Sequence, residues 1–263
     1  NVMKNNRFYC WLWPKLSFIK LKLSMLKTDN YTNLKEILAN IREQEFPSDR
    51  AKINYVRNWV KSNSTHLIDD EHNQYAFNVP IVLSKLYAHS KGQGALPHLS
   101  CGPRAYAMKE ILDGLKIKSR IIDLFGLSGD EPYKVSPHTL IEVYEADRKI
   151  WVLQDPDFNV AYSEKQTGQY LSVRKILKLG KGQLAFDSNN YEIENPINLK
   201  NTINELFEFC GLYRMSYEGR RSILLINSTL NRLDDKVLSE VGEYTLFSQY
   251  IYRRDYKYNV EYL

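Results

Sequence analysis

Three residues whose side chains can carry out acyl transfer occur in the order cysteine, histidine, aspartate. Cys101 opens the run Cys-Gly-Pro-Arg-Ala, where an apolar helical pattern begins. His138 follows a proline and starts an apolar, strand-like run, and Asp155 ends the next such run before another proline. A thiol, an imidazole and a carboxylate can serve as nucleophile, base and orienting group. We therefore predict that Cys101, His138 and Asp155 form a catalytic triad.

The predicted place of Cys101 at the start of a helix favours the thiolate, which is the reactive form of cysteine. Unpaired amides and the helix dipole both stabilise negative charge at a helix N-terminus. Gly102 leaves room for a substrate to approach closely, and the amide of Cys101 can help to bind an oxyanion. A lone cysteine in this place is more often structural, so the prediction depends on the histidine and the aspartate as well.

The spacing of His138 and Asp155 places them at one end of a predicted hairpin. Residues that face each other across an antiparallel hairpin share a constant sum of residue numbers. A two-residue turn at Ala146 and Asp147 gives a sum of 293, which is also the sum for His138 and Asp155. This register predicts Cβ atoms about 4.5–5.5 Å apart. Ala-Asp is not a favoured type I′ pair, so a longer loop with a shifted centre is the alternative, and it leaves both residues at the same end.

Helices and strands that could position these residues follow from the apolar spacing. Apolar residues at helical spacing predict helices at 31–44, at 80–89 and at 101–115, with a loop at 90–100. Ser48 or Asp49 is predicted to cap a further helix that begins there. Strands are predicted at 119–125, 138–145 and 149–153, with a loop at 126–137. Beyond residue 162 we predict helices at 170–179 and 199–209, a strand at 222–226 and alternating strand at 244–262.

Four motifs of the middle segment resemble those of a known superfamily. They are Cys101-Gly102-Pro103-Arg104-Ala105, Ser119-Arg120-Ile121-Ile122 with Gly126, His138-Thr139-Leu140-Ile141-Glu142-Val143-Tyr144 and Trp151-Val152-Leu153-Gln154-Asp155-Pro156. With these motifs, the segment from about 49 to 162 resembles the transglutaminase-like superfamily, a branch of the papain-like cysteine enzymes. The chain departs from the family pattern at Leu140, where the family commonly has tryptophan, and at Leu99-Ser100, where it has Gly-Gln.

The resemblance implies an α+β fold with a papain-like, transglutaminase-like core, in which the cysteine-bearing helix packs on an antiparallel sheet. It implies thiol-dependent acyl transfer or hydrolysis at an amide, of peptidase, amidase or transglutaminase type, on a protein or peptide substrate. No metal and no organic cofactor is implied. A different class of function is also open, a non-catalytic binding or scaffolding module of the same fold. Gln93 is a candidate oxyanion residue by type alone, and a surface loop residue is the simpler interpretation.

Length and composition bound the rest of the interpretation. The chain has 263 residues, 43% of them hydrophobic, so it can bury a sizeable core. We expect an N-terminal arm and helix at 1–48, a transglutaminase-like catalytic core at 49–165 and a C-terminal extension, packed on the core, at 166–263. Three cysteines make no complete set of disulfides, which favours a reducing, cytoplasmic location. Cys10 and Cys210 are expected to be small buried hydrophobes.

Other partners are restricted by the charge and by the motifs. The net charge of +5 is modest and no nucleic-acid-binding motif is found, so no nucleic acid is expected. Lysines interrupt the apolar stretch at 8–26, which predicts no transmembrane segment. An arm packed on the body is favoured there, with peripheral membrane contact as the alternative. The segment 66–72 holds histidines and acids but matches no metal motif, and a solvated acidic loop is favoured. The oligomeric state is left open.

Overall fold

The computed structural model describes residues 32–76, 78–127, 135–179, 181–195, 199, 210–214, 222–226 and 258–262. Within them the protein is α+β, as the sequence predicted. The described helices are α2 (Thr32–Arg42), α3 (Asp49–Ser62), α4 (Asp70–Tyr75), α5 (Val79–Ser90), α6 (Cys101–Gly114), α7 (Val173–Leu179) and the short 3-10 helix η2 (Lys181–Gln183). The described strands are β1 (Thr65–His66), β2 (His98–Leu99), β3 (Ser119–Leu127), β4 (Val135–Glu145), β5 (Ile150–Asp155), β6 (Val160–Glu164), β7 (Leu184–Asp187), β8 (Cys210–Arg214), β9 (Ser222–Ile226) and β10 (Tyr258–Tyr262).

The larger sheet has eight strands in the order β10-β9-β8-β3-β4-β5-β6-β7. Neighbouring strands run antiparallel except β9 and β10, which are parallel. The short strands β1 and β2 form a separate parallel pair, which brings the end of α3 beside the start of α6. The long strands β3 and β4 lie at the centre, and β4 and β5 carry the predicted histidine and aspartate.

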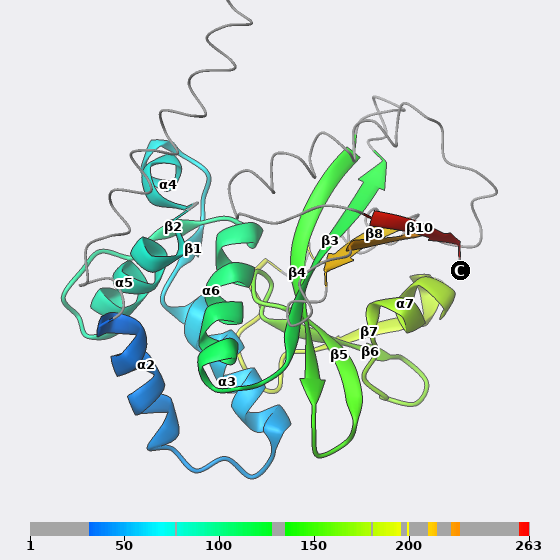
Figure 1. Ribbon diagram of the computed structural model, residues 1–263, viewed down its shortest axis with the longest axis horizontal. Coiled ribbons are helices and arrows are strands. Elements are labelled where there is room, and N and C mark those ends of the chain that lie inside the picture. The colour runs from blue at the N-terminus through cyan, green and yellow to red at the C-terminus, as the bar shows by residue number, and fades with distance from the viewer. Residues whose placement is uncertain are drawn as a thin grey trace, which may run out of the picture.

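The two faces of the sheet bury separate cores, because successive residues of a strand point to opposite faces. Ile121 and Ile141 pack with the helical side, whereas Ile122 and Leu140 pack with α7 on the other side. Figure 1 shows α2, α3, α5 and α6 on one side of the central strands and α7 on the other. The helix that bears Cys101 therefore packs on the sheet through an apolar side, with Met108 fully buried.

The helices begin where their capping residues stand. Ser48 has extended backbone and its hydroxyl accepts the amide of Ala51, so it is the N-cap of α3, one of the two caps that the sequence offered. Asp69 caps α4 by accepting the amide of His72. The acidic segment that we predicted as a solvated loop therefore contains a short helix, and His72 is buried within it. That part of the loop prediction is wrong, because a local cap is sufficient to start a turn of helix.

The hairpin of β4 and β5 has the longer loop with a shifted centre that the sequence gave as the alternative to a two-residue turn. Glu145 pairs with Ile150, so four residues form the loop and the register sum is 295 instead of 293. Lys149 adopts a left-handed conformation in this loop, and Asp49 of α3 accepts the amide of Ala146. The shift of two keeps every side chain on its predicted face, because a strand alternates with a period of two. Direct opposition of the histidine and the aspartate is wrong, and a diagonal placement replaces it.

The strands around the site are longer than predicted. β3 continues to Leu127 and β4 begins at Val135, so the predicted loop at 126–137 is shorter. The helix predicted at 170–179 begins only at Val173, whereas the strand at 222–226 is confirmed. The predictions for 1–30 and most of those for 199–209 and 244–257 lie outside the described residues. No helix of the described part is long and apolar enough to cross a membrane.

Candidate active site

Cys101 is the first residue of α6, and its side chain is partly exposed. The N-cap, Ser100, makes no side-chain capping bond. Its hydroxyl lies 3.0 Å from Nε2 of the buried His72 instead. The third helical position is Pro103, which has no amide hydrogen to be capped. The amides of the first turn of α6 are therefore not occupied by a side-chain cap.

His138 on β4 and Asp155 at the end of β5 are in contact. Nε2 of the imidazole lies 2.9 Å from Oδ2 of the carboxylate, and both side chains are buried. The contact is diagonal across the β4–β5 pair, consistent with the register above. The ring of Phe158 lies against the imidazole with its centroid 5.5 Å away. The contact with the carboxylate leaves Nδ1 as the ring nitrogen available to another partner.

The thiol of Cys101 meets the same imidazole. The Cys101 side chain acts on His138 through hydrogen bonding and charge, both of which raise the pKa of the imidazole. The amide of Thr139, the next residue along β4, donates to Sγ of Cys101 over 3.5 Å. Thr139 lies beyond the part of β4 that pairs with β5, whose last pair is Ile141 and Gln154. Its contact with Cys101 shows that the start of α6 lies against this part of β4. The structure thus brings together all three residues that the sequence singled out.

Asp155 is held by more than the imidazole. Oδ1 accepts the backbone amides of Asp157 at 2.9 Å and of Phe158 at 3.1 Å, which fixes the turn between β5 and β6. Oδ2 accepts the hydroxyl of Tyr162 at 3.0 Å. Burial, and then the charge of Asp155, raise the pKa of Tyr162 well above its usual value, so its phenol remains a donor. The carboxylate is therefore fixed in place on both of its oxygens.

The charge state of His138 follows from competing effects. Burial by itself would lower the pKa of His138, because a buried imidazolium loses its hydration. The charge of Asp155 and its hydrogen bond to the ring act in the other direction, and the contact with Cys101 adds to them. The net result is a pKa of His138 raised well above 6.5. An imidazolium at neutral pH is the partner that a thiolate requires.

Arg104, one turn after Cys101, was not singled out as a site residue from the sequence. It is fully buried and donates to Oδ1 of Asp157 at 3.0 Å, to Oε2 of Glu194 at 2.9 Å and to Oγ of Ser64 at 3.0 Å. Burial would raise the pKa of Asp157, but the hydrogen bond from His66 and the charge of Arg104 lower it. An arginine at the edge of an apolar helical stripe is the sequence signal that could have revealed this buried network.

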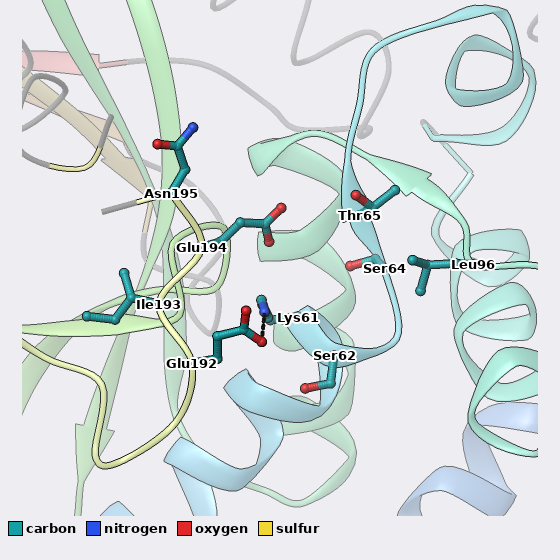
Figure 2. A pocket seen from close by; sticks show the side chains of 9 residues that line it. All are labelled: Lys61, Ser62, Ser64, Thr65, Leu96, Glu192, Ile193, Glu194 and Asn195. Atoms are coloured by element: carbon teal, nitrogen blue, oxygen red, sulfur yellow. Dashed lines mark hydrogen bonds and ion pairs between the residues drawn. The ribbon is translucent and has the colours of Figure 1, made fainter. Parts of the chain in front are cut away.

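A polar pocket of about 380 Å³ lies beside this network (Figure 2). It is lined by Lys61, Ser62, Ser64, Thr65, Leu96, Glu192, Ile193, Glu194 and Asn195. Ser64 and Glu194 belong both to its wall and to the partners of Arg104. Lys61 and Glu192 form an ion pair of 3.2 Å, drawn as a dashed line in Figure 2. None of the three residues of the predicted triad lines this pocket.

The remaining candidates do not join the cysteine site. In the described part of the chain, no three histidine, cysteine or acidic side chains are grouped so that they could hold a metal ion. Gln93 is exposed after α5, as expected of a surface residue. Its backbone amide donates to the carbonyl of Ala88. Cys10 and the side chain of Cys210 lie outside what the structure describes.

Comparisons with known proteins add little to this geometry. No family model matches the chain, and no curated protein matches it. Among solved structures, one described as "Crystal structure of a TGase" is 17% identical over 54% of this chain, with a TM-score of 0.31. The chain spans 37% of the length of that structure. A TM-score this low carries no argument about the fold or the function of this protein.

Proposed function

We propose that the protein catalyses thiol-dependent acyl transfer or hydrolysis at an amide, with Cys101 as nucleophile, His138 as base and Asp155 as orienting acid. One observation carries the proposal: a single buried imidazole contacts a buried carboxylate through Nε2, and the partly exposed Cys101 at a helix start lies against the same strand and raises the pKa of that imidazole. Each contact has the character that its role demands. A nucleophile must be reachable, whereas the groups that orient it gain strength from burial.

In the first step the Cys101 thiolate attacks the amide carbonyl carbon and forms a tetrahedral intermediate. The carbonyl oxygen then carries the negative charge, and the amides at the start of α6 can donate to it because no side chain caps them. The imidazolium of His138 gives its proton to the amide nitrogen as the C–N bond breaks. The amine leaves, and a thioester on Cys101 remains.

In the second step water or a primary amine attacks the thioester. His138, now neutral, takes the proton of the attacking group, the C–S bond breaks and the thiolate returns. Water gives hydrolysis and an amine gives transfer. Asp155 holds Nε2 throughout, which leaves Nδ1 to exchange the proton, and it stabilises the cation formed on the ring.

The proposal extends to the fold and to the setting of the protein. We propose a papain-like, transglutaminase-like core at 49–165, because all three site residues and the helix α3 that precedes them lie in this segment. The parts at 1–48 and 166–263 flank it. The proposed substrate is a protein or a peptide, and the proposed location is the cytoplasm.

A binding module is the second candidate, and one observation favours it. Asp155 accepts two backbone amides and thereby holds a turn, so its presence has a structural reason that does not involve catalysis. A module of this kind would keep the three residues together without turning over any substrate. The two candidates differ in whether Cys101 is acylated and then released.

An activated acyl donor tests the proposal directly. We expect p-nitrophenyl acetate to give a burst of nitrophenolate equal in amount to the protein, with the acetyl group found on Cys101 by mass spectrometry. The Cys101→Ala variant should give no burst. Added alkylamine should then divide the acetyl group between water and the amine. A wild-type protein without a burst, or with an acetyl group on another residue, would support the binding module.

A further inference from the structure

Asp123 on β3 is a buried acid that the proposed reaction does not use. It pairs across the sheet with Thr139 of β4, the residue after His138. The hydroxyl of Thr139 donates to Oδ1 of Asp123 over 2.8 Å, and both side chains are almost fully buried. A charged residue in the apolar run from Ile121 to Phe125 is the sequence feature that marks this position.

Thr139 also touches the nucleophile through its backbone. Its amide donates to Sγ of Cys101, so the side chain and the amide of one residue connect a buried acid to the thiol. A donor aimed at sulfur stabilises a thiolate more than a thiol, because hydrogen bonds to ionised groups are stronger. The direction of that amide depends on how the β4 backbone is held, and the Asp123–Thr139 bond holds it from the β3 side.

We propose that Asp123 is a positioning residue which acts through Thr139 to keep the Thr139 amide directed at the Cys101 thiolate. The inference depends on the proposed function, because that function makes the thiolate of Cys101 the nucleophile. It adds a residue from a strand that carries none of the three triad members. Asp123 and Thr139 touch no substrate in this account.

The charge of Asp123 acts on the site as well as its hydrogen bond. Burial raises the pKa of Asp123 to about 7, although the Thr139 hydrogen bond and the charge of His138 lower it in part. His138 is the ionisable group on β4 that acts on the carboxyl, and the pairing partner of Asp123 on β8 is Leu212. An ionised Asp123 therefore stabilises the imidazolium, the cation of the proposed thiolate pair.

Two substitutions separate the hydrogen bond from the charge. Thr139→Val removes the hydroxyl and leaves the carboxyl, whereas Asp123→Asn keeps an acceptor for Thr139 and removes the charge. Thr139→Ser is the matched control, because it loses a methyl group but keeps the donor. The readout is the rate at which iodoacetamide alkylates Cys101 between about pH 5 and pH 9, mapped by mass spectrometry on samples whose melting curves show that they are folded.

We expect Thr139→Val to slow alkylation near neutral pH by about five- to ten-fold, the usual scale for one hydrogen bond. Thr139→Ser should follow the wild-type profile. Asp123→Asn should leave the rate below about pH 7 unchanged, because the wild-type carboxyl is itself largely protonated there. Above that pH the rate should fall relative to wild type, because the imidazolium of the ion pair has lost the carboxylate that stabilises it. A merely structural role would lower the melting temperature and leave the pH profile of the folded protein in place.

The outcomes separate this inference from the proposed function. If wild-type Cys101 reacts as slowly as an ordinary thiol, the proposed function fails, and the inference fails with it. If wild-type Cys101 is activated and the profile of Thr139→Val coincides with it, the inference alone is overturned, whatever the charge effect in Asp123→Asn. If Thr139→Val does not fold, Thr139→Ala, which also removes the hydroxyl, takes its place in this comparison.

Discussion

Asp155 illustrates how one side chain serves both the fold and the site. Its Oδ1 accepts the two amides that close the β5–β6 turn, and its Oδ2 contacts the imidazole of His138 and the hydroxyl of Tyr162. The turn therefore fixes the carboxylate, and the carboxylate fixes the ring. A substitution at this position must be chosen so that it disturbs only one of the two functions.

Asp155→Asn makes that separation. The amide oxygen can keep both turn hydrogen bonds, while the amide nitrogen would face Nε2 of His138 and favour the wrong imidazole tautomer. We expect the protein to fold and the rate of Cys101 labelling to fall by at least about ten-fold. For comparison, the same change in a serine-protease triad lowers kcat by about 10⁴. Asp155→Ala, the control, should also lower the melting temperature. Wild-type labelling in folded Asp155→Asn would exclude Asp155 from the triad.

Asp123 leads to a prediction about stability and pH. The pKa of Asp123 is raised from 3.8 to about 7 in the fold. The stability linked to a raised pKa is fully present below the unfolded value and is lost as the pH rises through the folded value. The asparagine of Asp123→Asn cannot ionise, so the variant does not lose this stability. The difference in free energy of unfolding, variant minus wild type, should therefore increase between about pH 4 and pH 7, by about 1.4 kcal/mol for each unit of pKa shift. Urea titrations at both ends of that range would detect it, and a constant difference would contradict the shift.

The β4–β5 loop shows, at the scale of elements, what a local pattern cannot contain. Its four residues are held by Asp49, whose Oδ2 accepts the amides of Ala146 at 3.1 Å and of Asp147 at 3.3 Å. We expect Asp49→Ala to lower the free energy of unfolding by about 1 kcal/mol and to leave the labelling of folded Cys101 unchanged. Chemical denaturation measures the first effect. No loss of stability would mean that the loop sets its own length.

The sequence predicted those elements whose pattern is local. Helix α6 and strands β3 to β5 have apolar residues at a clear period, so their existence followed from the chain alone. The sequence did not predict β6 and β7, because they pair with each other across a long stretch of chain. It did not predict β1 and β2, because each has only two residues. The sequence left the hairpin register open between a two-residue turn and a longer loop, because the contact with α3 that accompanies the longer loop is not a local feature.

The candidate site followed the same division. Cys101, His138 and Asp155 could be selected because each stands beside a recognisable start or end of an element. Arg104, Asp123 and Tyr162 could not, because their importance lies in contacts across the fold. A charged side chain inside an apolar run was the available signal for the first two. Tyr162 carried no signal among the many tyrosines of the chain.

The buried Arg104 network connects parts of the whole molecule. Arg104 joins Asp157 in the turn after β5, Ser64 before β1 and Glu194 in the segment after β7. We expect Arg104→Leu to lower the free energy of unfolding by about 3–5 kcal/mol, because the buried carboxylate of Asp157 and the partly buried one of Glu194 lose the guanidinium. Arg104→Lys should recover only part of the loss, since an ammonium cannot replace the planar fork. Urea denaturation compares the three proteins, and equal midpoints would contradict a structural role for the network.

The central claim is that Cys101 and His138 form a thiolate–imidazolium pair, and the pH dependence of Cys101 alkylation tests it most directly. The rate with iodoacetamide should already be substantial near pH 6, where an ordinary cysteine of pKa about 8.5 is almost fully protonated. His138→Gln should remove this acidic limb, and Cys10 and Cys210 serve as reference thiols in the same sample. A wild-type profile that rises only near pH 8.5 and coincides with that of His138→Gln would contradict the account.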